Sequence, residues 1–180
     1  DAERALRRTG SAAPALDGVG PVDRAPIEGW NEVTAARHEQ YRDAVELPNG
    51  VVTVMCVSRR PDRFDEVVRA VTSQVEVPVR LVFVANDPGF DVDRCRARLG
   101  EEPFDAEFLV PPDGTSLGVG LNMALAATST RWVAKFDDDD LYGPHHLADS
   151  LRALGYSGAG VVGKHSYYAD VVGAGERVIR

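Results

Sequence analysis

Apolar residues recur along the chain in two alternating patterns, and this alternation predicts the fold class. From residue 51 onward, short and nearly continuous apolar runs alternate with stretches whose apolar residues recur at intervals of three and four. The first pattern is typical of strands buried in a parallel sheet, and the second of amphipathic helices. The predicted strands are residues 51–57, 79–85, 107–110, 132–136 and 160–163. The predicted helices are residues 64–71, 91–99, 116–127 and the segment after Pro144.

The alternation of strand and helix predicts an α/β domain with a mostly parallel sheet flanked by helices. On the helix that Ser116 is expected to cap, we predict that Leu117, Leu121 and Leu125 share one face. Residues 1–48 differ, because glycine and proline interrupt them repeatedly. We interpret 1–48 as a linker or N-terminal appendage with a helix near 30–45, and 49–180 as the α/β part.

Composition and charge narrow the class of protein. The chain has 180 residues, of which 44% are hydrophobic, and this is enough for one domain with a real core. The formal net charge of −8 argues against a nucleic-acid-binding surface as the main function. The sequence contains no apolar run of transmembrane length and does not open with a signal peptide, so we expect a cytoplasmic protein without a membrane span. Its two cysteines make no disulfide framework, and Cys56 is interpreted as a small buried hydrophobic residue.

Four consecutive aspartates, residues 137–140, follow the strand predicted at 132–136. Parallel sheets bind ligands at the carboxyl ends of their strands, and a divalent cation is the economical reason for holding four mutually repelling charges together there. Mg²⁺ and Mn²⁺ take one or two carboxylates together with the phosphates of a substrate. In an extended chain Asp137 and Asp139 project to the same side and offer two carboxylates to one ion. The alternatives are a solvated acidic turn and an acid-rich helix N-terminus.

Two further motifs are weaker indications of a binding site. Residues 158–163 have the G-x-G-x-x-G spacing of a dinucleotide fingerprint, but a helix-like segment precedes them and no helix opens within them. We therefore interpret them as a glycine-rich start of a strand. His145 and His146 lie just past the aspartates, but neighbouring residues on a helix do not face the same way. A capping or surface role is favoured for this pair over a metal-ligand role.

Four segments, taken in order, resemble the family 2 glycosyltransferases, which have the GT-A fold. They are a strand with a polar loop at 52–60, a strand ending in an acidic turn at 84–87, a loop and helix at 116–122, and a strand ending in the Asp-x-Asp motif at 135–140. The resemblance covers residues 51 to about 170 and rests on the ordered set. It implies a GT-A-like, Rossmann-like α/β fold.

The resemblance also implies an activity and a site. The activity is transfer of a sugar from a nucleotide-sugar donor, commonly a UDP-sugar, to a carbohydrate or other hydroxyl acceptor. The positions that match the nucleotide-binding motifs of the family are Ser58, Arg59, Asn86, Asp87, Asn122 and Asp137. Asp137 and Asp139 are implied as ligands of Mg²⁺ or Mn²⁺. A metal held by Asp139 would stabilise the charge that the leaving diphosphate accumulates.

This sequence departs from the pattern of the family in places. Leu121 precedes Asn122 where many members carry arginine, and the loop at 57–60 lacks the common Pro-Thr-Tyr-Asn. Inverting members use a carboxylate base well downstream of the Asp-x-Asp motif. Asp170 and Glu176 are the only acids after Asp149, and we assign the role to neither.

We therefore expect the base beyond Arg180, in a longer chain of which this is the donor-binding piece, truncated at its C-terminal end. Two alternatives stay open. One is a nucleotidyltransferase that makes nucleotide-sugars, although the loop at 58–61 lacks the glycines that such enzymes carry there. The other is a non-catalytic module that binds nucleotide-sugars.

Overall fold

The chain forms two compact units in a computed structural model that describes residues 27–164, 168–171 and 176–179. One unit is Leu47–Asp149, and the other combines Asp1–Glu46 with Ser150–Arg180. Helix α6 (His146–Ser157) begins in the first unit and ends in the second. The division into residues 1–48 and 49–180 stays a prediction.

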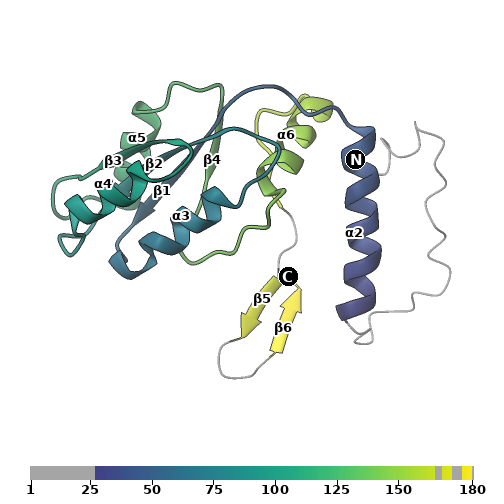
Figure 1. Cartoon of the computed structure of the whole chain (residues 1–180), viewed down its shortest axis with the longest axis horizontal. Coiled ribbons are helices and arrows are strands. Elements are labelled where there is room, and N and C mark those ends of the chain that lie inside the picture. Colours follow the sequence, from purple (N-terminus) through teal and green to yellow (C-terminus); the bar gives the residue numbers. More distant parts are fainter. Residues whose placement is uncertain (1–26, 165–167, 172–175, 180) are drawn as a thin grey trace. The chain divides into compact units, whose positions relative to one another are not determined.

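The unit Leu47–Asp149 is built on a four-stranded parallel sheet with the strand order β3-β2-β1-β4 (Figure 1). Its strands are β1 (Val52–Ser58), β2 (Val79–Ala85), β3 (Asp105–Leu109) and β4 (Trp132–Lys135). Central strand β1 pairs along its whole length with β2, from Val52 opposite Val79 to Ser58 opposite Ala85. The predicted α/β class with a mostly parallel sheet is confirmed, because each connection returns the chain to the same end of the sheet.

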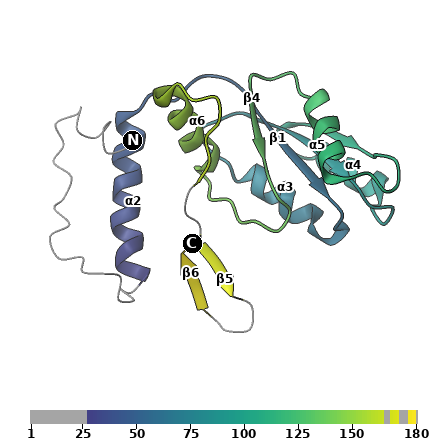
Figure 2. The same cartoon turned by 180° about the vertical axis from the view of Figure 1, so that it is seen from behind.

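Helices cover both faces of this sheet. They are the short η1 (Pro61–Arg63), α3 (Phe64–Thr72), α4 (Val92–Gly100) and α5 (Leu117–Ala126). Helices α3 and α4 lie on one face and α5 on the other (Figures 1 and 2). On the first face Phe83 packs edge-on against Phe64, with ring centroids 5.0 Å apart, and stacks on Phe108 at 5.6 Å. On the second face Val82 and Val84 pack with Ala124. Adjacent residues on β2 thus serve opposite layers, whereas residues two apart share one, as the strand period requires.

Helix α5 contacts the sheet through its smallest residues, so the face that Leu117, Leu121 and Leu125 share is not the one that packs on the sheet. Leu117 and Leu125 are half-exposed, whereas Gly120 and Ala124 are buried. A Cβ atom at position 120 would lie 2.8 Å from Cγ1 of Val57 on β1. The helix lies so close to the sheet that only small side chains fit between them.

Both cysteines are free and buried in this unit. Cys56 on β1 is fully buried, which confirms its interpretation as a small hydrophobic residue. Burial raises the pKa of its thiol to about 12, and burial also raises the pKa of Cys95. Because the thiolate is the reactive form, neither cysteine suits nucleophilic chemistry at neutral pH.

The second unit contains α2 (Ile27–Ala44), which confirms the helix predicted near 30–45, and an antiparallel pair of β5 (Tyr168–Val171) and β6 (Glu176–Ile179). The strand predicted at 160–163 is wrong, since this stretch has no regular secondary structure and Val161 is 87% exposed. A strand needs a face to bury, and this stretch has none. Within the described residues, no helix has the length and apolar character that crossing a membrane requires.

Candidate functional site

The loops that follow β1, β2, β3 and β4 all leave the sheet at its carboxyl edge. Parallel strands bring their C-terminal ends to one edge, and ligands of α/β folds bind there. Two hydrogen bonds hold the start of these loops in place. Asn86 N–H donates to the Ser58 carbonyl at 2.8 Å, and Phe136 N–H donates to the Met55 carbonyl at 2.9 Å. The pairing of β1 with each neighbour therefore extends one residue into the loop.

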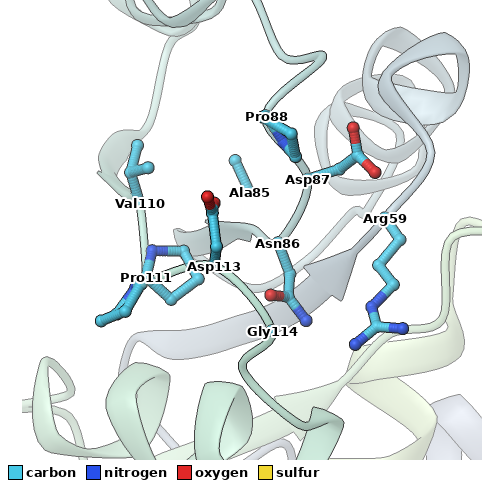
Figure 3. Close-up of a pocket in the computed structure, with 10 residues that line it drawn as sticks. Arg59, Ala85, Asn86, Asp87, Pro88, Val110, Pro111, Asp113 and Gly114 are labelled. Carbon is cyan, nitrogen blue, oxygen red and sulfur yellow. The ribbon is translucent and has the colours of Figure 1, made fainter.

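A cavity of about 350 Å³ opens at this edge, between the loops after β1, β2 and β3 (Figure 3). Arg59 comes from the first loop, Asn86 and Asp87 directly follow β2, and Asp113 stands on the loop after β3. The remaining lining residues are Ala85, Pro88, Val110, Pro111, Pro112 and Gly114. The cavity thus combines an apolar surface, rich in proline, with a few polar side chains, as small-molecule sites do.

The polar side chains of the cavity are held by the backbone. The Thr115 carbonyl accepts hydrogen bonds from Arg59 Nη2 at 3.0 Å and from Asn86 Nδ2 at 2.9 Å. Asp87 Oδ1 accepts from Gly89 N–H at 2.8 Å. The contacts of Arg59 and Asn86 join three loops that are far apart in sequence, because both side chains meet the same Thr115 carbonyl.

The four aspartates at 137–140, here called the acid turn, follow β4 at the same edge. Strand β4 ends at Lys135, and Asp138 and Asp139 form a turn. The prediction that Asp137 and Asp139 project to one side of an extended chain is therefore wrong. Their environments are set by the turn and by the partners that each carboxylate finds.

Asp138 faces inward and anchors the acid turn. Its side chain is 8% exposed, accepts a hydrogen bond from the Ser58 hydroxyl, and is paired with the Arg60 guanidinium, whose Nε lies 3.1 Å from Oδ2. Burial alone would raise the pKa of Asp138, but the hydrogen bonds from Arg60 and Ser58 outweigh it and hold this pKa below its ordinary value. Its oxygens are thus already satisfied within the protein.

Asp137 and Asp139 face outward. Asp137 pairs with the Lys135 ammonium and its side chain is 44% exposed, while Asp139 is 57% exposed and lies 3.0 Å from Arg60 Nη2. Exposed pairs of this kind contribute little to stability. Both carboxylates are therefore open to a cation from solvent.

Tyr142 packs the end of the acid turn against the residues that begin it. Its ring stacks on Phe136 with centroids 3.7 Å apart, and its hydroxyl accepts a hydrogen bond from Asp137 N–H at 2.8 Å. Burial raises the pKa of Tyr142, so its hydroxyl stays protonated at neutral pH. Beyond the turn, Gln74 Nε2 donates to the Gly143 carbonyl at 3.1 Å. The turn is thus held at both ends.

The donor set of the acid turn fits a divalent cation that is shared with a ligand. Among the residues that the structure describes, no group of three or more His, Cys, Asp or Glu side chains is assembled to hold a metal. Mg²⁺ and Mn²⁺ at phosphate sites need only one or two carboxylates, because phosphate oxygens and water supply the rest. Asp137 and Asp139 meet that requirement, whereas Asp138 does not.

The structure separates the residues predicted to bind a nucleotide into three groups. Arg59, Asn86 and Asp87 come together around the cavity. Ser58 is buried beneath the acid turn, with its hydroxyl on Asp138. Asn122 is exposed on α5 and is not among the residues that line the cavity.

Sequence reasoning missed three residues of the site. Asp113 follows a predicted strand, so the rule that places ligands at strand ends was a signal for it. Arg60 pairs with Asp138 across 78 positions of sequence, and no local pattern indicates that contact. Tyr142 looks like an ordinary loop aromatic until its ring is seen on Phe136.

The parallel sheet with helices on both faces defines a glycosyltransferase-like α/β fold, and solved glycosyltransferases share it. The mannosyltransferase PcManGT from Pyrobaculum calidifontis, solved in complex with GDP-Man and Mn²⁺, matches with a TM-score of 0.54 and 16% identity, over 86% of this chain and 44% of that one. TarS 1–349 from S. aureus matches with a TM-score of 0.51 and 14% identity, over 58% of this chain and 32% of that one. This chain thus spans less than half the length of either. No protein-family model and no curated protein sequence matches it.

Proposed function

We propose that the unit Leu47–Asp149 binds the nucleotide-sugar donor of a glycosyltransferase, with Mg²⁺ or Mn²⁺ shared between the acid turn and the donor diphosphate. One observation carries the proposal. The neighbouring residues Arg59 and Arg60 reach the two halves of the site, since Arg59 lines the cavity and Arg60 contacts Asp138 and Asp139. A nucleoside in the cavity would therefore have its phosphates beside the acid turn.

Each part of the site has a role in this proposal. The cavity holds the nucleoside through Asn86, Asp87 and the proline-rich wall. Asp137 and Asp139 hold the metal, which acts as a Lewis acid on the diphosphate when bound. Arg60 remains beside the acid turn, where its positive charge adds to the stabilisation of the departing diphosphate.

The fold similarity supports this class of donor. PcManGT was solved with a nucleotide-sugar and Mn²⁺, and we extend that ligand class, but not the sugar, to this chain. The sequence resemblance implies a nucleotide-sugar, commonly a UDP-sugar, and leaves the base of this donor open, and the acceptor is a carbohydrate or another hydroxyl compound. The finer assignment to family 2, with residues 137–139 as its Asp-x-Asp motif, belongs to the same proposal.

The proposal is tested by calorimetric titration of UDP and GDP into the full chain, with Mn²⁺ and with EDTA. We expect at least one nucleotide to bind in Mn²⁺ and to bind far more weakly in EDTA. Asp139→Ala should weaken Mn²⁺-dependent binding by at least tenfold, which corresponds to about 1.4 kcal/mol. Its unfolding temperature should change little, because substitutions of exposed residues usually alter stability by less than about 0.5 kcal/mol.

Asp93→Ala is the matched control, because Asp93 is an exposed aspartate of α4 and its loss changes the net charge equally. It should leave nucleotide binding unchanged. If neither nucleotide binds to the unaltered chain, or if Asp139→Ala binds normally in Mn²⁺, the proposed function is wrong. If Asp139→Ala unfolds the protein, the acid turn has a structural role instead.

A further inference from the structure

The cavity presents an unusual balance of hydrogen-bonding groups, which bears on the base that it accepts. Asn86 Nδ2 and Arg59 Nη2 each commit one N–H to the Thr115 carbonyl. That carbonyl can only accept, so the Asn86 amide is oriented with Nδ2 toward Thr115 and with Oδ1 left as an acceptor. Asp87 likewise has one oxygen on Gly89 N–H and one to spare.

Asp113 adds two more acceptors. Among the described residues it has no hydrogen-bond or ion-pair partner, and it lines the cavity from the loop after β3. In Figure 3 its carboxylate and the Arg59 guanidinium lie on opposite sides of Asn86. A carboxylate at neutral pH accepts hydrogen bonds and never donates. The cavity therefore offers acceptors from three side chains, of which the Asp113 carboxylate has both oxygens available, and its side-chain donors are the remaining N–H groups of Arg59 and Asn86.

Nucleobases differ in how well they match such a surface. Uracil presents one N–H between two carbonyl oxygens, and those oxygens would face carboxylate oxygens across the cavity. Guanine presents a ring N–H and an amino group side by side, which two oxygens of one carboxylate can accept together, and its carbonyl oxygen remains for Arg59. A base that displaces water from the Asp113 carboxylate without donating to both of its oxygens leaves an acceptor unpaired, which is costly, so the mismatch disfavours uracil.

We propose that the donor carries guanine, and that Asp113 is the residue that selects it by accepting hydrogen bonds from the ring N–H and the amino group. This inference rests on the proposed function. Asp113 is favoured over Asp87 for this contact because both of its oxygens are available, whereas one oxygen of Asp87 is held by Gly89. The flat faces of Pro88, Pro111 and Pro112 supply the apolar surface against which a bicyclic ring packs.

The test compares GDP, IDP and UDP by calorimetric titration into the full chain in Mn²⁺. IDP differs from GDP only in lacking the amino group, so the ratio of the two affinities reports on that one contact. We expect GDP to bind about tenfold or more tightly than IDP and than UDP, because a two-point contact of this kind discriminates to that extent.

Asp113→Asn replaces one acceptor with a donor and should reduce GDP affinity about tenfold while bringing the GDP-to-IDP ratio close to one. A purely structural role for Asp113 would lower both affinities equally and leave that ratio unchanged, which would overturn the proposal. Asp93→Asn on α4 is the matched control and should behave as the unaltered chain. Because Asp113 is exposed, the unfolding temperature of the Asp113→Asn variant should equal that of the unaltered chain.

The outcomes separate the two proposals. If UDP binds as tightly as GDP or more tightly, the guanine inference is wrong and the proposed function stands. If none of the three nucleotides binds in Mn²⁺, the proposed function fails and the inference fails with it.

Discussion

Consecutive aspartates of the acid turn have different tasks because their surroundings differ. Asp138 is buried and satisfied by Ser58 and Arg60, whereas Asp139 is mostly exposed and, among the described residues, pairs with Arg60 alone. Removing a buried carboxylate leaves its hydrogen-bonding partners unpaired. When an exposed carboxylate is removed, water can take its place beside those partners. The burial of each side chain therefore decides whether it stabilises the fold or is free to bind a ligand.

This contrast leads to a prediction about stability. Asp138→Asn should lower the free energy of unfolding by about 1–3 kcal/mol, the usual cost of leaving a buried donor or acceptor without its partner. Asp139→Asn should change it by less than about 0.5 kcal/mol. Urea denaturation followed by circular dichroism measures both. Equal losses in the two variants would contradict the division of roles between these residues.

At the scale of elements, the spacing between α5 and the sheet depends on one glycine. Gly120 faces Val57 of β1, and the helix comes near enough for Val82 and Val84 of β2 to pack on Ala124. The leucines of the helix then point away from this contact. Thr115 lies in the loop that leads directly into α5, and its carbonyl holds Asn86. The position of α5 therefore also sets one side of the cavity.

Gly120→Ala should destabilise the protein, although alanine favours helix formation. The added Cβ would meet Val57 Cγ1 at 2.8 Å, and overpacking of a filled core costs about 1–3 kcal/mol. Gly118→Ala on the same helix is the control, because nothing lies within 4 Å of its Cβ position. That control should be neutral or should stabilise by up to about 1 kcal/mol. Thermal melts that gave both variants the same shift would show that α5 is not packed as described.

At the scale of the whole molecule, charge governs which ligands can approach. The formal net charge is −8, and four of the carboxylates that contribute to it lie in the acid turn, beside the position proposed for the phosphates. A diphosphate approaching this surface is repelled unless a divalent cation reverses the local sign.

We therefore expect the order of affinities to invert on metal removal. In Mn²⁺ the nucleoside diphosphate should bind more tightly than its nucleoside, because the metal joins the phosphates to Asp137 and Asp139. In EDTA the diphosphate should bind more weakly than the nucleoside, and added NaCl should narrow that difference by screening the repulsion. Calorimetry of GDP and guanosine, and of UDP and uridine, provides the comparison. If the diphosphate still binds more tightly than its nucleoside in EDTA, the prediction is wrong, and the phosphates are bound by Arg59, Arg60 or Lys135 instead of by the metal.

Much of the fold was predictable because strands and helices have local periods. The runs at 51–57 and 79–85 were predicted within one residue of β1 and β2, and Ser116 does cap α5 through a hydrogen bond to Val119 N–H. Where prediction failed, the apolar pattern did not specify a burying partner. Residues 160–163 have strand-like composition but form no strand, and Leu117 and Leu125 have helical spacing but lie on the exposed side of α5.

The sequence by itself determined that this is an α/β protein whose acidic cluster follows a strand, because hydrophobic periodicity and strand-end chemistry are local properties. It also identified Arg59, Asn86 and Asp87, which come together around one cavity. Only the tertiary structure decided that Asp138 is an internal anchor, that Arg60 is its partner and that Asp113 completes the cavity. The physical reason is that burial and pairing depend on atoms brought together from distant positions, such as residues 60 and 138, and no periodicity along the chain records them.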